Sequence, residues 1–251
     1  MDEAEMTRLI GIVGRSFTGS TLLSKLFWCS PGVVSPGETH WLVDDPSRTE
    51  CMVCHDACPA LTAEFRRSEF TEENLYRRLA ERFGTNTLVV SEVQRQRYEC
   101  FCKPKTMDAV IIHKSPFGFV ASDLRRKVRT ADEALFTLDH YKDVYSDILE
   151  WAERFCNRFV VVRYETLAAD HVATMRAIFD ALGLERGHVP EDLSKIDYHY
   201  IYGSQHTHAA CSVSLDERWR TELDKELVDL IASDQGAMAL QHRLIEASIT
   251  P

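Results

Sequence analysis

The residues of this chain best suited to chemistry form a glycine-bounded turn rich in hydroxyl groups. Residues 9–27 read LIGIVGRSFTGSTLLSKLF. Gly14, Gly19 and Thr21 keep the spacing of the nucleoside-triphosphatase loop G-x-x-x-x-G-K-[ST]. In that loop backbone N–H groups surround phosphate, the lysine reaches the β- and γ-phosphates, and the last hydroxyl holds Mg²⁺. The lysine position is Ser20 here, so the sequence predicts an anion site without the cation for a γ-phosphate.

An anion can be held at such a turn by backbone and hydroxyl groups together. The start of the helix expected over residues 19–29 offers aligned N–H groups and the positive end of its dipole. Ser16, Thr18, Ser20 and Thr21 add hydroxyl donors. Serine and threonine also cap helices where no ligand binds. We favour the anion site because a strand, a turn and a helix follow one another as the motif requires.

The composition and charge of the chain limit the classes of protein to which it can belong. The 251 residues are 45% hydrophobic, enough for a full core. A net charge of −10 argues against binding of nucleic acid through a basic face. The chain lacks a run of about 18 apolar residues that could span a membrane, and its acidic start, MDEAEMTR, is unlike a secretory signal. We therefore expect a cytoplasmic protein whose eight cysteines are thiols or metal ligands rather than disulfides.

Short apolar strands alternate with helices along the chain. This order predicts an α/β fold, a three-layer parallel sheet with helices on both faces, and ligands at the carboxyl ends of the strands. We expect a single domain over residues 1–251, with a cysteine-containing insertion at about 44–70 and a turn-rich connection at 31–36. The strands are expected at 8–13, 87–91, 109–113 and 159–162, and the helices at 19–29, 71–83, 118–129, 131–155, 173–182 and within 216–243.

Four segments in the same order resemble the sulfotransferases that use 3′-phosphoadenosine-5′-phosphosulfate (PAPS), especially the compact bacterial type. GRSFTGSTLL (14–23) resembles their 5′-phosphosulfate loop, and VIIHKSPFGFVASDLRR (110–126) is similar to their 3′-phosphate element. FVVVRYETL (159–167) matches a strand and turn of the family. HYIYGS (199–204) followed by DERWRTEL (216–223) resembles the family's C-terminal pattern.

The resemblance implies a P-loop-like sulfotransferase fold and in-line transfer of a sulfonyl group from PAPS to a hydroxyl or amine of an unidentified acceptor. PAPS would be the co-substrate, 3′,5′-adenosine bisphosphate (PAP) the product, and residues 40–70 and 92–106 the acceptor side. The resemblance also implies the donor-binding residues, which are Arg15, Ser16, Phe17, Thr18, Gly19, Ser20, Thr21 and Leu22 for the phosphosulfate and Lys114 and Ser122 for the 3′-phosphate.

Two positions depart from the family pattern. Phe17 stands where the family usually has Arg or Lys, so Arg15 is the nearest candidate to stabilise the leaving phosphate, and Lys114 is the next. Lys-Ser-Pro at 114–116 replaces Arg-Asp-Pro, which keeps the positive charge but loses the bidentate guanidinium.

The candidate catalytic base is Glu38, in PGETHWL. It resembles the catalytic glutamate of the heparan sulfotransferases. An acceptor hydroxyl has a high pKa, so attack on sulfur needs a base within hydrogen-bond reach. His40 is the alternative base, ranked after Glu38. Glu165, in RYETL, is expected to be architectural, as a helix cap or a partner of Arg163.

The cysteines indicate a second site. Cys51, Cys54 and Cys58, together with Cys102 or Cys100, could hold a structural zinc ion. Free thiols or a disulfide stand as an equal alternative. Three histidines occur in HYIYGSQHTH, and we interpret them as part of a polar loop over the co-substrate, since they have no cysteine or carboxylate at ligand spacing. They are His199, His206 and His208.

Two other functions remain open from the sequence. The first is a nucleotide kinase or another P-loop phosphate-binding enzyme, disfavoured by Ser20. The second is a non-catalytic nucleotide-binding module. Binding of the bisphosphate product without Mg²⁺ separates the sulfotransferase from the first alternative, and turnover separates it from the second.

Overall fold

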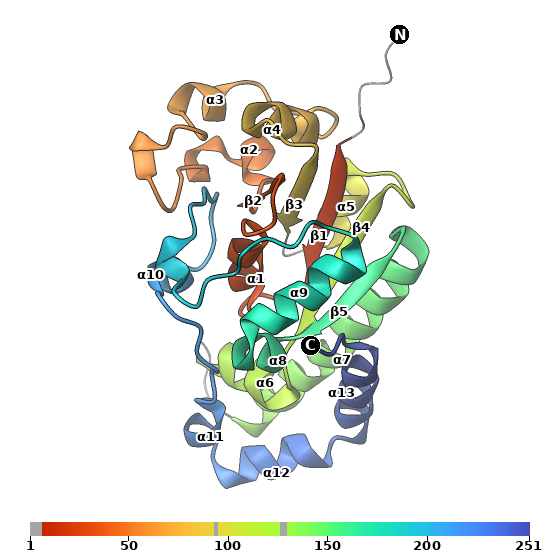
Figure 1. Ribbon diagram of the computed structural model, residues 1–251. Helices are drawn as coiled ribbons and strands as arrows, with labels where there is room; N and C mark the ends of the chain where they lie inside the picture. Colours follow the sequence, from red (N-terminus) through yellow and green to blue (C-terminus); the bar gives the residue numbers. More distant parts are fainter. Residues whose placement is uncertain (1–6, 93–94, 126–129) are drawn as a thin grey trace.

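The computed structural model describes residues 7–92, 95–125 and 130–251 (Figure 1). In this part of the chain five strands form one parallel sheet in the order β2-β3-β1-β4-β5. The predicted three-layer α/β fold is confirmed, because helices cover both faces of the sheet. The strands are β1 (Arg8–Val13), β2 (Val33–Gly37), β3 (Thr87–Ser91), β4 (Met107–His113) and β5 (Phe159–Arg163).

Alternate side chains of the central strands enter two separate cores. On β1, Leu9 and Val13 belong to one core, whereas Ile10 and Ile12 belong to the other. Strands buried on both faces read as nearly continuous apolar runs, which is why the sequence shows them clearly. The first core also contains α4 (Leu75–Phe83), α6 (Pro116–Leu124), α7 (Ala131–Phe155), α12 (Lys225–Ser233) and α13 (Gln235–Ala247), and the second contains α1 (Ser20–Phe27) and α9 (His171–Leu182).

Two segments expected to be irregular contain regular structure. Residues 31–36, predicted as a turn-rich connection, contribute most of the edge strand β2. Pro36 lacks an N–H group, which an edge strand tolerates, and its carbonyl accepts the N–H of Ile201 at 2.7 Å. The segment around Cys100, where the sequence predicted no helix, contains α5 (Arg95–Phe101).

Short helices complete the described chain. None of the described helices is long and apolar enough to cross a membrane. Residues 1–6 of the acidic start and Arg126 of the 3′-phosphate segment lie outside the described residues. The short helices are α2 (Trp41–Asp44), η1 (Pro46–Arg48), η2 (His55–Ala57), α3 (Ala63–Arg67), α8 (Tyr164–Ala169), η3 (Leu193–Lys195), α10 (Gln205–Ala209) and α11 (Trp219–Glu222).

Candidate functional site

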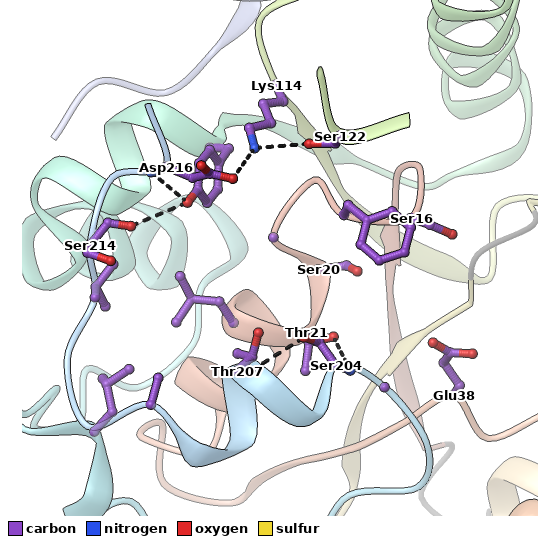
Figure 2. A pocket seen from close by; sticks show the side chains of 18 of the residues that line it. Ser16, Ser20, Thr21, Glu38, Lys114, Ser122, Ser204, Thr207, Ser214 and Asp216 are labelled. Atoms are coloured by element: carbon purple, nitrogen blue, oxygen red, sulfur yellow. Dashed lines mark hydrogen bonds and ion pairs between the residues drawn. The ribbon is translucent and has the colours of Figure 1, made fainter. Parts of the chain in front are cut away.

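A cavity of about 980 Å³ lies at the carboxyl ends of β1 and β4 (Figure 2). Parallel strands direct their following loops to the same edge of the sheet, and this brings the loop before α1 beside the start of α6. Most residues expected to bind the donor line the cavity, together with both candidate bases. They are Ser16, Phe17, Gly19, Ser20, Thr21, Leu22, Lys114, Ser122, Glu38 and His40.

The loop between β1 and α1 leaves the start of the helix open. Gly19 is the N-cap residue with φ 95°, and among the described residues no side chain caps α1. Thr18 instead donates its hydroxyl to the carbonyl of Arg15 at 2.6 Å. The first N–H groups of a helix have no partner within it, so those at the start of α1 are available to an anion.

Lys114 lies at the end of β4 with only 3% of its surface exposed. Its Nζ donates to Asp216 Oδ2 at 3.2 Å and reaches Ser122 Oγ at 3.5 Å. It also stands 4.7 Å from the centre of the Tyr164 ring. Burial lowers the pKa of the Lys114 ammonium, against the attraction of Asp216.

Asp216 joins three cations at this end of the cavity. Besides Lys114, it contacts Arg218 at 2.8 Å and Arg125 at 3.5 Å. Hydrogen bonds from Arg218 hold the pKa of Asp216 well below its usual range. Arg125 and Arg218 also line the cavity, although sequence reasoning gave neither a role. Arg125 falls within the quoted 110–126 segment and Arg218 within the quoted DERWRTEL segment, and these two segments were the available signal.

Arg15 lies beside the main cavity rather than in its lining. It lines a smaller adjoining cavity of about 80 Å³ that shares Ser16, Phe17 and Ser122 with the main one, and it is not among the described residues that line the main cavity. Of the two cations considered for the leaving phosphate, Lys114 is therefore the one that faces the main cavity.

Glu38 follows β2 and faces the cavity. Trp41 Nε1 donates to its Oε2 at 3.3 Å. Burial raises the pKa of the Glu38 carboxyl, and the Glu92 carboxylate adds to the rise. In the view of Figure 2, Ser20 and Thr21 lie between Glu38 and the pair formed by Lys114 and Asp216.

His40 is held by a buried carboxylate that the sequence did not indicate. Its Nδ1 is hydrogen-bonded to Glu92, which follows β3 and is 1% exposed. Glu92 also accepts the Thr39 hydroxyl at 2.9 Å. An imidazole fixed in this way through one nitrogen can present its other nitrogen as a base, so His40 and Glu38 are both suited to proton transfer.

Glu165 has the architectural contacts expected from the sequence. Its Oε2 accepts Arg163 Nε at 3.2 Å, and its Oε1 accepts the backbone N–H of Ser115 at 2.9 Å. Ser115 is the N-cap residue of α6. Glu165 therefore ties β5 to the start of the helix that follows Lys114.

A second group of potential ligands lies outside the cavity lining. Cys51, Cys54, Cys58 and His199 each place one donor atom within 4.8 Å of the others, a set that could hold a metal ion. The expected fourth ligand, Cys102, is not among them. Cys102 follows α5 and packs against the core, where burial raises its pKa to about 12. No cysteine lies at ligand spacing from His199 in the sequence, but the structure places Cys54 and Cys58 beside its ring.

Known structures resemble this fold, whereas no protein-family model and no curated protein matches the sequence. A sulfotransferase domain from the curacin biosynthetic pathway aligns with a TM-score of 0.62 and 14% identity, covering 98% of this chain and 100% of that one. The sulfotransferase domain of the Synechococcus PCC 7002 olefin synthase aligns with a TM-score of 0.54 and 18% identity, covering 99% and 98%. The chain therefore has the fold of the sulfotransferases.

Proposed function

We propose that this protein is a sulfotransferase that moves a sulfonyl group from PAPS to a hydroxyl or amine of an acceptor. The proposal is supported by one cavity with two ends suited to anions, the open start of α1 and the cations around Lys114. Two anion sites suit a donor with a 5′-phosphosulfate and a 3′-phosphate. Two structures of the same fold are sulfotransferase domains.

The donor would lie across the cavity between these ends. The N–H groups at the start of α1 and the hydroxyls of Ser20 and Thr21 would hold the 5′-phosphosulfate. Lys114 and Ser122 would hold the 3′-phosphate. This phosphate would replace Asp216 as the partner of the Lys114 ammonium. Ser20 in the lysine position supports a ligand without a γ-phosphate.

Transfer would occur in one displacement at sulfur. The acceptor oxygen or nitrogen forms the new bond to sulfur while the bond from sulfur to the bridging phosphate oxygen breaks. The acceptor proton passes to Glu38, and the electron pair leaves with PAP. The helix N-terminus and the hydroxyls of Ser20 and Thr21 would stabilise the charge that develops on the departing 5′-phosphate.

His40 is the second candidate for the base because the buried Glu92 orients its ring. Glu38 remains the first candidate. It faces the cavity, and burial raises the pKa of its carboxyl, which makes its carboxylate a stronger base than an exposed one.

Transfer of label from PAPS tests this function. Protein incubated with ³⁵S-labelled PAPS and an extract of polar metabolites should release PAP and label an acceptor. Glu38→Gln should reduce turnover about a hundredfold, whereas Glu64→Gln, an exposed change on α3, should not. Transfer of the γ-phosphoryl group of ATP with Mg²⁺, without sulfonyl transfer, would support the kinase alternative. Nucleotide binding without any turnover would support the non-catalytic module.

A further inference from the structure

Three thiols and one imidazole lie close together next to residues 202–204, which line the cavity. Cys54 Sγ lies 3.3 Å and Cys58 Sγ 3.4 Å from His199 Nδ1, and with Cys51 all four donor atoms lie within 4.8 Å of one another. Around a tetrahedral zinc ion with bonds of about 2.1–2.3 Å, ligand atoms stand about 3.5–3.8 Å apart. One ion can therefore contact all four donors with little rearrangement.

Two of the sulfur donors are buried and accept hydrogen bonds from the backbone. Cys51 is fully buried and Cys58 is 2% exposed. Backbone N–H groups point at both sulfurs, from Cys54 to Cys51 at 3.5 Å and from Leu61 to Cys58 at 3.2 Å. Burial and these backbone contacts together fix the positions of both sulfurs.

The imidazole is oriented by aromatic neighbours. The ring of His199 meets Trp28 edge to face, with ring centres 5.9 Å apart, and lies 6.3 Å from Phe83. These contacts hold its Nδ1 toward the sulfurs. Three thiolates and a neutral imidazole form a common donor set of structural zinc sites, and four protein ligands leave no position open for catalysis.

We propose that Cys51, Cys54, Cys58 and His199 bind one Zn²⁺ ion, which fastens residues 44–70 to the segment that covers the nucleotide site. Figure 1 shows the chain before α10 running beside the 44–70 segment. The two segments also meet through their backbones, because the N–H of Met52 donates to the Tyr200 carbonyl at 2.8 Å and Cys51 pairs with Ile201.

The metal-bound segment leads directly to the cavity. Two residues after His199, the Ile201 carbonyl accepts the N–H of Glu38 at 3.0 Å. Three residues further on, the N–H of Ser204 donates to Thr21 Oγ1 at 3.4 Å. The four ligands lie outside the described residues that line the cavity. Loss of zinc should therefore weaken PAP binding indirectly, and this one consequence rests on the proposed function.

Elemental analysis tests the metal site directly. Protein purified without chelator should contain about one zinc per chain, because the binding energy of such a site is part of the folding energy. Cys54→Ser and His199→Ala should lose the zinc, whereas Cys102→Ser, the matched control, should keep it. Cobalt in place of zinc should give thiolate-to-metal charge-transfer bands that disappear in the same two variants.

A further variant, His199→Cys, tests the metal site if Cys54→Ser and His199→Ala do not fold. This variant offers four thiolates at the same positions and should retain the ion with a tetrathiolate cobalt spectrum, and loss of the metal would overturn the proposal. A folded, metal-free wild type would overturn it as well, as would loss of zinc in Cys102→Ser.

A thiol count separates the zinc site from a disulfide. Denatured, chelator-treated protein without reductant should show all eight thiols of the sequence, and a count lower by two would overturn the proposal. A zinc-loaded protein that fails to bind PAP would support the metal site and contradict the proposed function.

Discussion

Glu38 and Asp216, two of the carboxyl groups that line the cavity, have opposite surroundings. Burial raises the pKa of Glu38, whereas hydrogen bonds from Arg218 lower that of Asp216. Environments that separate the pKa values of neighbouring acids commonly assign them different roles. Glu38 is suited to accept a proton, and Asp216 is suited to remain charged among the cations that surround it.

Replacing Glu38 with Gln should stabilise the protein while it reduces turnover about a hundredfold. A carboxyl whose pKa is raised on folding favours the folded state only when it is protonated, so at pH 7 the wild type carries the cost of a buried charge. Glu38→Gln should raise the free energy of unfolding at pH 7. The gain should shrink as the pH falls through the raised pKa and vanish below the ordinary value of 4.5. Denaturant unfolding at several pH values measures this.

The exposed control for that experiment is Glu64→Gln, which should change neither stability nor turnover. If Glu38→Gln turns over normally and His40→Ala does not, then His40 is the base. The pH dependence of kcat should distinguish the two residues in the same way. The fall of kcat toward low pH should disappear only in the variant that lacks the base.

The cavity-lining residues that the sequence predicts belong to local motifs, whereas contacts that depend on the tertiary fold were missed. Glu38 and Lys114 stand in recognisable patterns close to strands. Glu92 contacts His40 across 52 positions and His199 meets Cys54 across 145. Such distances leave no signal in spacing, which is why the sequence predicts Cys102, and not His199, beside Cys51, Cys54 and Cys58.

At the scale of elements, the start of α1 depends on a glycine. Gly19 has φ 95°, and a Cβ there would lie 2.7 Å from Cδ2 of Tyr164. A left-handed conformation costs other residues about 1–2 kcal/mol. The collision with the Tyr164 ring adds to this cost and would displace the loop that faces the phosphosulfate site.

Gly19→Ala should therefore lower the free energy of unfolding by more than about 2 kcal/mol and weaken PAP binding. Gly32→Ala is the matched control, because Gly32 has φ 70° and its Cβ would meet nothing within 4 Å. It should cost only about 1–2 kcal/mol and leave PAP affinity unchanged. Equal effects of the two changes on PAP binding, measured by calorimetry, would contradict this account of the loop.

The sequence predicted elements well where periodicity was strong. The structure has β1, β3 and α7 with the expected bounds, because an apolar run or a helical stripe continued through each. It failed for β2, whose Val33–Gly37 segment contains a proline and a glycine among turn residues. There the hydrogen bonds to β3 and Ile201, rather than local preference, determine the conformation.

At the scale of the whole molecule, we propose that residues 1–251 fold as one domain that includes the 44–70 segment. Cys58, Leu61 and Phe70 of that segment belong to the same core as Leu9 and Ile111 of the central strands. Zinc-loaded protein should therefore unfold in one transition, with fluorescence and circular dichroism coinciding. A separate early transition confined to the 44–70 segment would contradict the single domain.

The central claim is that the cavity binds a 3′,5′-bisphosphate nucleotide without Mg²⁺, and calorimetry tests it most directly. PAP should bind one to one without added Mg²⁺, at least about tenfold more tightly than ATP with Mg²⁺. Lys114→Met should weaken PAP binding by about 1.5–3 kcal/mol, because it removes charge-assisted contacts to the 3′-phosphate. Lys142→Met, which removes a cation paired with Asp234 away from the cavity, should not. Binding of ATP with Mg²⁺ as tight as that of PAP, or equal PAP affinity in Lys114→Met and the wild type, would contradict the account.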